Sequence, residues 1–399
     1  MIRAPSTELR TEPTPPELRG MAHFVGRAFS DELELAYRYV DRLCLELCLS
    51  LADELALLSN EPESLDRLMG RVGAVDEARY LVHAVLDILT ETSFARRTDS
   101  GWKRCGQWPL DRSRGTHDRA CQACPAASPT FELIERCRAA ATGFVTGRTR
   151  GLAAIFPRGD LTLWERLHNE DRVMSIYADL AASALHAAVR PGMRVLEVGG
   201  GVGSVLARCA SPLEAAGIGE YWFTDVGRTF VEAARDRHKD IPWLRFAQLD
   251  VDRRLEQQGF QPESFDVVVG VNVAHVARDL GYSLRELRGA LRPGGRLILG
   301  EGSPPNKHDR WRLDIVFAFL RGWWDVAVDS LRPRAGFMLP SEWGRALTAC
   351  GYDPVSLIPG EGWFAGSCRG GLIVAGTPGR RAESGVGPMD DEGRWRISF

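Results

Sequence analysis

The chain has 399 residues, of which 44% are hydrophobic and 26% charged, and its formal net charge is −3. Such proportions suit a globular protein that buries a full core, and the mixing of acidic and basic residues argues against a dedicated nucleic-acid binder. No membrane or export segment is evident, because the most apolar helical stretch, 311–324, is short and interrupted by charges. The amino-terminal residues also lack the apolar run of a secretory signal. We therefore expect a cytoplasmic protein.

The first part of the chain favours helices. Residues 1–20 are rich in proline and polar side chains, which predicts a disordered tail. Apolar residues at helical spacing follow over 22–57, and two further helices and a short hairpin follow before 106. This order predicts a helical, winged-helix-like domain over 21–149. The positive charge of this domain is reduced by three acidic residues, Asp66, Asp76 and Glu77. We therefore expect the domain to serve in packing or in a homodimer contact. DNA binding or cofactor sensing is the alternative.

Four cysteines are concentrated in the second half of this region. Cys121 and Cys124 have the spacing of half a zinc knuckle, and the two other candidate ligands are Cys105 and Cys137. His117 could replace one of these outer cysteines. The spacing is irregular, so the cluster is read either as a structural zinc site or as buried free thiols.

From Met193 short apolar runs alternate with helical segments. The runs that predict strands are 193–198, 220–225, 243–249, 265–271 and 296–301, with two more at 354–358 and 371–376. Such alternation is typical of an α/β domain with a mostly parallel sheet covered on both faces. We assign this Rossmann-type domain to 191–377, a preceding lid segment to 150–190 and a polar tail to 378–399.

A glycine-rich loop follows the first of these strands. Three glycines, Gly199, Gly201 and Gly203, allow a sharp turn at the strand's carboxyl end. The third glycine comes one position too early for the G-x-G-x-x-G dinucleotide fingerprint. The pattern suits S-adenosylmethionine, which has no phosphate to bind, and Glu197 is placed to orient the loop or the ammonium group of the cofactor.

Acidic residues also end the next two strands. Asp225 closes the second strand, where its two oxygens could accept from the ribose hydroxyls of the cofactor. Asp250 ends the third strand and could receive the adenine amino group, with Val251 offering a backbone N–H. Four elements in this order at the carboxyl ends of strands predict a binding site for S-adenosylmethionine.

The sequence resembles the class I methyltransferases that use S-adenosylmethionine, and among them the C-methyltransferase domains of polyketide synthases. The residues that carry this resemblance are VLEVGGGVGS, YWFTDVGRTFVEAA, LDVDRRLEQQGF, FDVVVGVNVAHVARDL, LRPGGRLILGEG and GWWD followed by LPSEWGRALTACGY. It covers about 150–375, including the lid segment. The sequence departs from the usual pattern in GGGVGS and in the residues that follow His275.

The resemblance implies a catalytic dyad of His275 and Glu301 and a cofactor contact from Asn272. His275 lies just after the fourth predicted strand and Glu301 ends the fifth, so adjacent strands would bring the two side chains together. A histidine near neutral pKa can take the proton of a carbon between two carbonyls, and a carboxylate on its other nitrogen fixes the tautomer. The expected reaction is C-methylation of an activated keto or acyl substrate, which could be a carrier-bound β-ketoacyl group in natural-product biosynthesis. A small-molecule O- or N-methyltransferase of secondary metabolism is the alternative.

Further residues are expected to complete the site. Tyr177 and Asn169 lie in the lid, where they could cover the methionine part of the cofactor. Trp323 and Trp324 end the apolar segment after the fifth strand and could form the acceptor pocket, although burial in the core explains them nearly as well. Two other histidines near the site, His168 and His308, are expected to be surface or lid residues.

Overall fold

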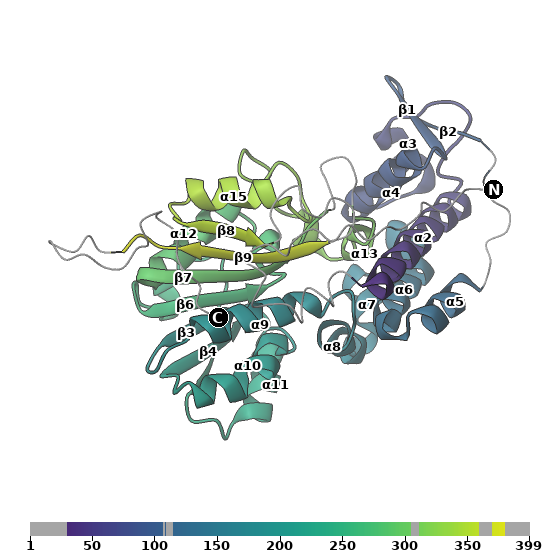
Figure 1. Cartoon of the computed structure of the whole chain (residues 1–399). Helices are drawn as coiled ribbons and strands as arrows, with labels where there is room; N and C mark the ends of the chain where they lie inside the picture. Colours follow the sequence, from purple (N-terminus) through teal and green to yellow (C-terminus); the bar gives the residue numbers. More distant parts are fainter. Residues whose placement is uncertain (1–29, 107, 109–114, 305–310, 359–368, 380–399) are drawn as a thin grey trace.

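The computed structural model describes residues 30–106, 108, 115–304, 311–358 and 369–379. The predicted tail at 1–20, most of the one at 378–399, and His308 lie outside these residues. Helices dominate up to residue 188, and a sheet flanked by helices follows (Figure 1). Within the described residues, no helix is long and apolar enough to cross a membrane.

The amino-terminal region is built around two long helices. α2 (Asp31–Glu54) packs along α6 (Ser128–Val145), and its inward positions at helical spacing are fully buried. The other elements are α3 (Leu65–Val72), α4 (Arg79–Glu91), β1 (Ala95–Thr98), β2 (Gly101–Arg104), α5 (Thr116–Ala123), α7 (Gly151–Ile155), α8 (Thr162–Asn169) and α9 (Ile176–Ala188). The predicted helices and hairpin are confirmed, while the winged-helix-like resemblance stays a prediction.

The four cysteines predicted as zinc ligands do not come together; they are Cys105, Cys121, Cys124 and Cys137. Within the described residues, no three His, Cys, Asp or Glu side chains are grouped closely enough to hold a metal ion. The Cys137 Sγ lies 3.8 Å from the Val316 carbonyl oxygen, and the Cys124 Sγ lies 3.8 Å from that of Glu32. The described residues therefore do not form the zinc site that the spacing suggested: Cys124 and Cys137 are buried in separate contacts, while Cys105 and Cys121 are half-buried.

The described residues after 188 include a seven-stranded sheet, in the order β5-β4-β3-β6-β7-β9-β8. β9 pairs antiparallel with both β7 and β8, and the other neighbouring strands of this sheet pair in parallel. The strands are β3 (Arg194–Val198), β4 (Glu220–Asp225), β5 (Leu244–Gln248), β6 (Phe265–Val271), β7 (Leu291–Gly302), β8 (Val355–Ile358) and β9 (Gly370–Gly376). The chain reverses direction across the sheet between β3 and β6, and such switch points are where open α/β sheets bind ligands.

Helices cover both faces of the sheet, as predicted. Successive residues of β3 point to opposite cores: Val195 packs with the amino-terminal helices, and Leu196 packs in the second core. The helices of the first face are α9, α10 (Ser204–Ala215) and α11 (Arg228–His238), and those of the second are α12 (Leu280–Ala290) and α15 (Pro340–Ala349). The mostly parallel α/β fold is thus confirmed (Figure 1).

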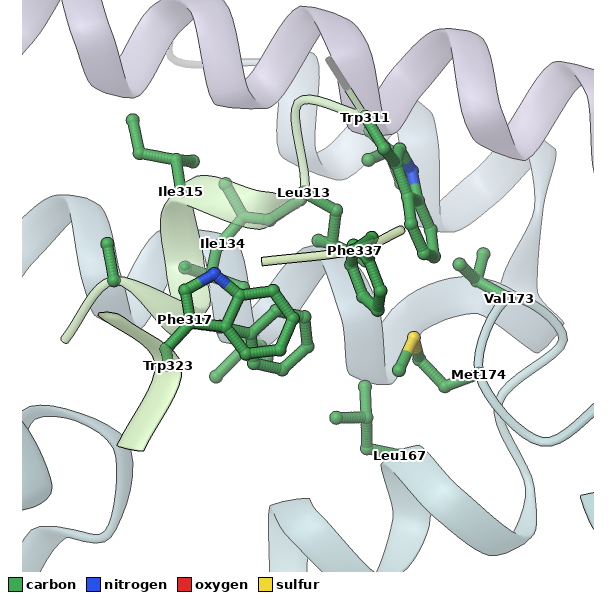
Figure 2. Packing of buried hydrophobic residues seen from close by; sticks show 14 of the residues in the cluster. Ile134, Leu167, Val173, Met174, Trp311, Leu313, Ile315, Phe317, Trp323 and Phe337 are labelled. Carbon is green, nitrogen blue, oxygen red and sulfur yellow. The ribbon is translucent and has the colours of Figure 1, made fainter. Parts of the chain in front are cut away.

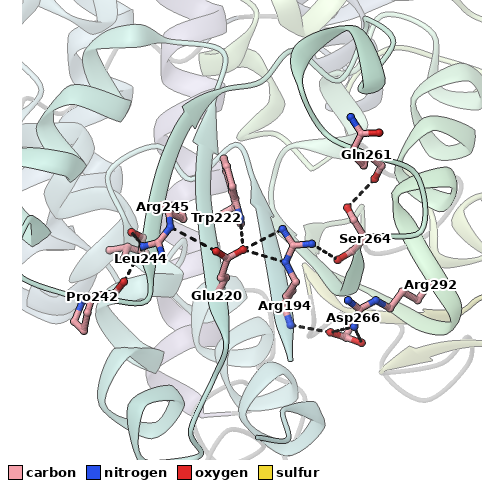
Figure 3. A network of polar contacts seen from close by, with 10 residues as sticks. All are labelled: Arg194, Glu220, Trp222, Pro242, Leu244, Arg245, Gln261, Ser264, Asp266 and Arg292. Atoms are coloured by element: carbon pink, nitrogen blue, oxygen red, sulfur yellow. Dashed lines mark hydrogen bonds and ion pairs between the residues drawn. The ribbon is translucent and has the colours of Figure 1, made fainter. Parts of the chain in front are cut away.

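An ion network fastens the amino-terminal edge of the sheet (Figure 3). Arg194 of β3 donates to Glu220 of β4 over 3.0 Å and to the Ser264 carbonyl over 3.1 Å. Its backbone N–H donates to Asp266 of β6, which also pairs with Arg292. The network holds three strands in register at the edge opposite the glycine loop.

The segment predicted as one helix over 311–324 forms two short helices. α13 (Asp314–Phe317) and α14 (Arg321–Trp324) are separated because Leu320 adopts an extended backbone conformation, with φ −98° and ψ 121°. This break redirects the chain, so that Trp323 enters the core while Trp324 remains partly exposed.

Candidate active site

The glycine loop joins β3 to α10. Gly199, Gly201 and Gly203 all have positive φ angles, of 62°, 51° and 81°. A Cβ at Gly199 would lie 2.4 Å from a methyl carbon of Val273, whereas one at Gly203 would meet nothing within 4 Å. The loop is therefore packed against the segment that follows β6 at Gly199 and open at Gly203, where a ligand can approach the backbone.

Asp225, at the end of β4, holds this loop. Its two carboxylate oxygens accept from the backbone N–H groups of Gly201, over 2.9 Å, and Gly227, over 2.7 Å. Burial raises the pKa of Asp225, and the two backbone hydrogen bonds lower it in part. Each oxygen keeps a further lone pair, so the carboxylate can also accept from a diol placed over the loop.

Glu197 is the most perturbed carboxyl group of the site. It is 2% exposed and accepts a 2.8 Å hydrogen bond from the Tyr221 hydroxyl. Burial raises its pKa to about 8; the Tyr221 hydrogen bond opposes this shift and the charge of Asp225 adds to it. At neutral pH the ligand-free protein therefore holds Glu197 mainly protonated, and a cation beside it would favour its ionised form.

We expect Glu197→Gln to stabilise the ligand-free protein at alkaline pH. Because the folded-state pKa of about 8 lies above the usual value of 4.5, the native state binds an extra proton, and its stability falls as the pH rises between these values. Glutamine keeps an acceptor for Tyr221 without a charge. The melting temperature of the variant should exceed that of wild type above pH 8 and match it near pH 4.5. An equal offset at both pH values would contradict this account.

The loop after β5 is organised by Gln258. The Asp250 N–H donates to Gln258 Oε1 over 2.9 Å, and the Gln258 amide donates back to the Asp250 carbonyl. The Asp250 carboxylate accepts from the N–H of Asp252, and Val251 lies between them, half-buried. Asp250 and Val251 thus sit at the same sheet edge as Asp225, in a loop whose shape Gln258 sets.

His275 and Glu301 meet at the ends of β6 and β7. The His275 Nδ1 lies 2.5 Å from Glu301 Oε2, and both side chains are at most 2% exposed. The other Glu301 oxygen accepts from the N–H groups of Val273 and Ala274. Because a carboxylate accepts, a neutral imidazole in this contact has its proton on Nδ1 and its lone pair on Nε2. Nε2 has no hydrogen-bond partner among the described residues.

Aromatic rings enclose the histidine. Its ring centroid is 4.9 Å from that of Trp323 and 5.2 Å from that of Phe337. Phe317 and Trp311 extend the same cluster, and Figure 2 shows Leu167, Val173 and Met174 of the lid segment facing it. The imidazole therefore borders an apolar cluster to which residues of the segment 150–190 also contribute.

The other predicted residues are distributed around this edge. Asn272, with φ 49°, accepts from the Gly302 N–H and so joins the ends of β6 and β7. The Tyr177 hydroxyl donates to the Arg369 carbonyl over 2.7 Å, at the start of β9, so the tyrosine lies at the β7 and β9 side of the sheet. The indole N–H of Trp324 donates to the Ala318 carbonyl, and of the two tryptophans Trp323 is the one in ring contact with His275.

Sequence reasoning missed several residues that build the site. Arg208 of α10 pairs with Asp179 of α9 over 2.5 Å and donates to the Asn169 carbonyl, which links the lid to the glycine-loop helix. Beside it, burial and the charge of Arg208 lower the pKa of His168 to about 4. Phe337 was also missed. No local motif marks these residues, because their partners lie far away in the sequence.

Comparison with known proteins agrees with this geometry. A family model described as a methyltransferase domain matches residues 196–297, which run from β3 into β7. These residues therefore belong to a methyltransferase domain of the class that uses S-adenosylmethionine. The resemblance to polyketide synthases is supported by relatives. Polyketide synthase ThaQ of Burkholderia thailandensis is 28% identical over 82% of this chain, and highly reducing polyketide synthase pspA of Penicillium soppii is 30% identical over 61%.

The chain spans only a small part of these curated relatives, 16% of ThaQ and 9% of pspA. Solved structures show the same fold over nearly the whole chain. The CurJ carbon methyltransferase superposes with a TM-score of 0.80 at 24% identity, covering 91% of this methyltransferase chain and 97% of CurJ. The DszA carbon methyltransferase gives 0.76 at 21% identity, covering 93% and 98%. Both neighbours include the helical region that precedes the sheet.

Proposed function

We propose that the methyltransferase methylates an acidic carbon of a β-ketoacyl substrate, with His275 as general base and Glu301 as its partner. The observation that carries the proposal is the buried dyad, in which Glu301 occupies Nδ1 and leaves Nε2 without a partner among the described residues. A carbon between two carbonyls is acidic enough for imidazole to deprotonate, and nothing stronger is needed. The likeness to carbon methyltransferases supports the choice of carbon.

The residues of the glycine-loop edge fit the cofactor. Gly201 and Gly203 would leave room for S-adenosylmethionine, Asp225 would accept from its ribose hydroxyls, and Glu197 would be the acid nearest its ammonium group. Asp250 and Val251 would border the adenine, while Asn272 and Tyr177 would lie on the methionine side. When bound, the cofactor supplies a methyl group on a sulfonium, which is electrophilic without further activation.

The side chains of the protein transfer the proton and exclude water. His275 Nε2 takes the proton from the substrate carbon, and Glu301 stabilises the imidazolium that forms, because Nδ1 donates to it over 2.5 Å. The electron pair of the C–H bond becomes the enolate, whose carbon would be the nucleophile toward the methyl group that a bound cofactor would supply. Trp323 and Phe337 exclude water that would otherwise reprotonate the enolate.

The test is methyl transfer to 3-oxoacyl thioesters of N-acetylcysteamine and of an acyl carrier protein. We expect a product with one added methyl group whose proton NMR signal is a doublet, as for a methyl on a CH carbon. The 2,2-dimethyl-3-oxoacyl thioester is the matched control, since it lacks the acidic proton and should accept no methyl. An O-methyl product, or transfer only to phenols or amines, would favour the alternative of a small-molecule O- or N-methyltransferase.

A further inference from the structure

The loop that carries His275 is held by one buried arginine. Arg332 is 0% exposed, and its guanidinium donates to the carbonyl oxygen of His275 over 3.1 Å. The same group donates to the carbonyl oxygens of Ala277, over 2.6 Å, and Arg278, over 2.7 Å. Three carbonyls within four residues of the catalytic loop therefore share a single planar donor.

Arg332 is itself fixed in a tight turn. Its backbone N–H donates to the Asp329 carboxylate over 2.9 Å, and the Asp329 N–H donates back to its carbonyl. Its Nε donates to the Ala327 carbonyl over 2.9 Å. This turn follows α14, whose Trp323 ring packs against the imidazole. Arg332 thereby links the histidine to the segment that supplies one aromatic wall.

The guanidinium charge of Arg332 is compensated by backbone carbonyl oxygens, which accept its hydrogen bonds. Within the described ranges no carboxylate lies within ion-pair distance of its guanidinium, and burial lowers its pKa, an effect opposed by the charges of Asp329, Asp252 and Asp279. Burying a cation without a carboxylate partner is costly, and a planar fork that bonds several carbonyls fixes their geometry closely. A neutral apolar side chain would fill the same space without holding the loop.

We propose that Arg332 is a positioning residue for methyl transfer, which fixes the His275 main chain so that Nε2 faces the acceptor carbon. The inference rests on the proposed role of His275 as the base. A displacement of about 1 Å at a reacting group can cost about 10²-fold in rate. Arg332 acts through the carbonyl of His275 and the loop, with no contact to substrate.

Arg332→Gln and Arg332→Lys test this role. We expect kcat for the 3-oxoacyl thioester to fall about 10²-fold in Arg332→Gln. Both the KM and the dissociation constant for S-adenosylmethionine should stay within about twofold of the wild-type values. Arg332→Lys keeps the positive charge but loses the planar guanidinium, so its kcat should lie between those of wild type and Arg332→Gln. Millimolar guanidinium should restore part of the kcat of Arg332→Gln. The matched control is Arg190→Gln, because Arg190 also donates to two carbonyls, those of Ala187 and Val189, and should leave kcat unchanged.

A second measurement needs no acceptor. In the protein saturated with S-adenosylmethionine, ¹⁵N shifts of the His275 ring report its tautomer, and loss of the signal in His275→Gln assigns it. We expect one tautomer with the proton on Nδ1 in wild type, and a mixed or broadened signal in Arg332→Gln. Unchanged shifts together with unchanged kcat would overturn the proposal. The proposal would also be overturned if melting temperature, cofactor affinity and kcat all fell together and guanidinium did not restore kcat. That result would mean that Arg332 has a purely structural role.

The two proposals can fail separately. If wild-type protein methylates no 3-oxoacyl thioester while the His275 shifts still depend on Arg332, the proposed function fails and the positioning of His275 stands. If wild type is active and neither measurement changes in Arg332→Gln, the role of Arg332 fails alone.

Discussion

His275→Ala should lower methyl transfer to a 3-oxoacyl thioester by about 10²- to 10⁴-fold, the usual contribution of a general base. The physical reason is that Nε2 of His275 accepts the substrate proton in the proposed mechanism, and the ring is buried, with Nε2 lacking another partner among the described residues. Single-turnover kinetics with saturating S-adenosylmethionine give the rate, and calorimetry gives the cofactor affinity, which should stay within about twofold. Turnover equal to wild type would exclude His275 as the base.

A second histidine paired with a carboxylate provides a control for this variant. His83 of α4 also pairs with a carboxylate, its Nδ1 lying 3.2 Å from Asp87, and its ring packs edge-on against Trp102. His83→Ala therefore removes a histidine with a carboxylate partner and an aromatic neighbour, but far from the glycine loop in the sequence. It should leave the rate of methyl transfer unchanged. An equal fall in both variants would mean that loss of folded protein, rather than loss of a base, explains the result.

Asp225→Ala should weaken the binding of S-adenosylmethionine by at least about tenfold. The variant removes the acceptor of two backbone N–H groups, from Gly201 and Gly227, and a hydrogen bond to a charged group contributes about 1.5–3 kcal/mol. The glycine loop then loses its link to β4 as well as the carboxylate proposed to accept from the ribose hydroxyls. Titration calorimetry against wild type measures the effect, and unchanged affinity would remove Asp225 from the proposed cofactor site.

Asp266→Ala separates this effect from a general loss of stability. Asp266 lies at the other edge of the same sheet, where it accepts from the Arg194 N–H and pairs with Arg292 (Figure 3). Its removal should lower the melting temperature as much as Asp225→Ala does, while the affinity for S-adenosylmethionine stays near that of wild type. Equal weakening of cofactor binding in both variants would show that the sheet, and not the loop contact, controls affinity.

The sequence by itself determined the α/β class, the strands and the position of the glycine loop. Short apolar runs that alternate with helical segments leave few other arrangements, and glycines with positive φ at Gly199, Gly201 and Gly203 are a local requirement. The contact between His275 and Glu301 could be expected from the sequence, because neighbouring parallel strands have their carboxyl ends on the same side of the sheet. These inferences depend on periodicity and strand order, which are readable along the chain.

Only the tertiary structure decided the contacts between distant segments. The cysteines looked like a zinc cluster in sequence, yet their helices turn Cys124 and Cys137 toward different partners. The break at Leu320 that brings Trp323 onto the imidazole has no local signal. Arg332 reaches the loop of His275 only because the turn after α14 folds back over it. Such contacts follow from how the layers pack, and packing is set by the whole chain at once.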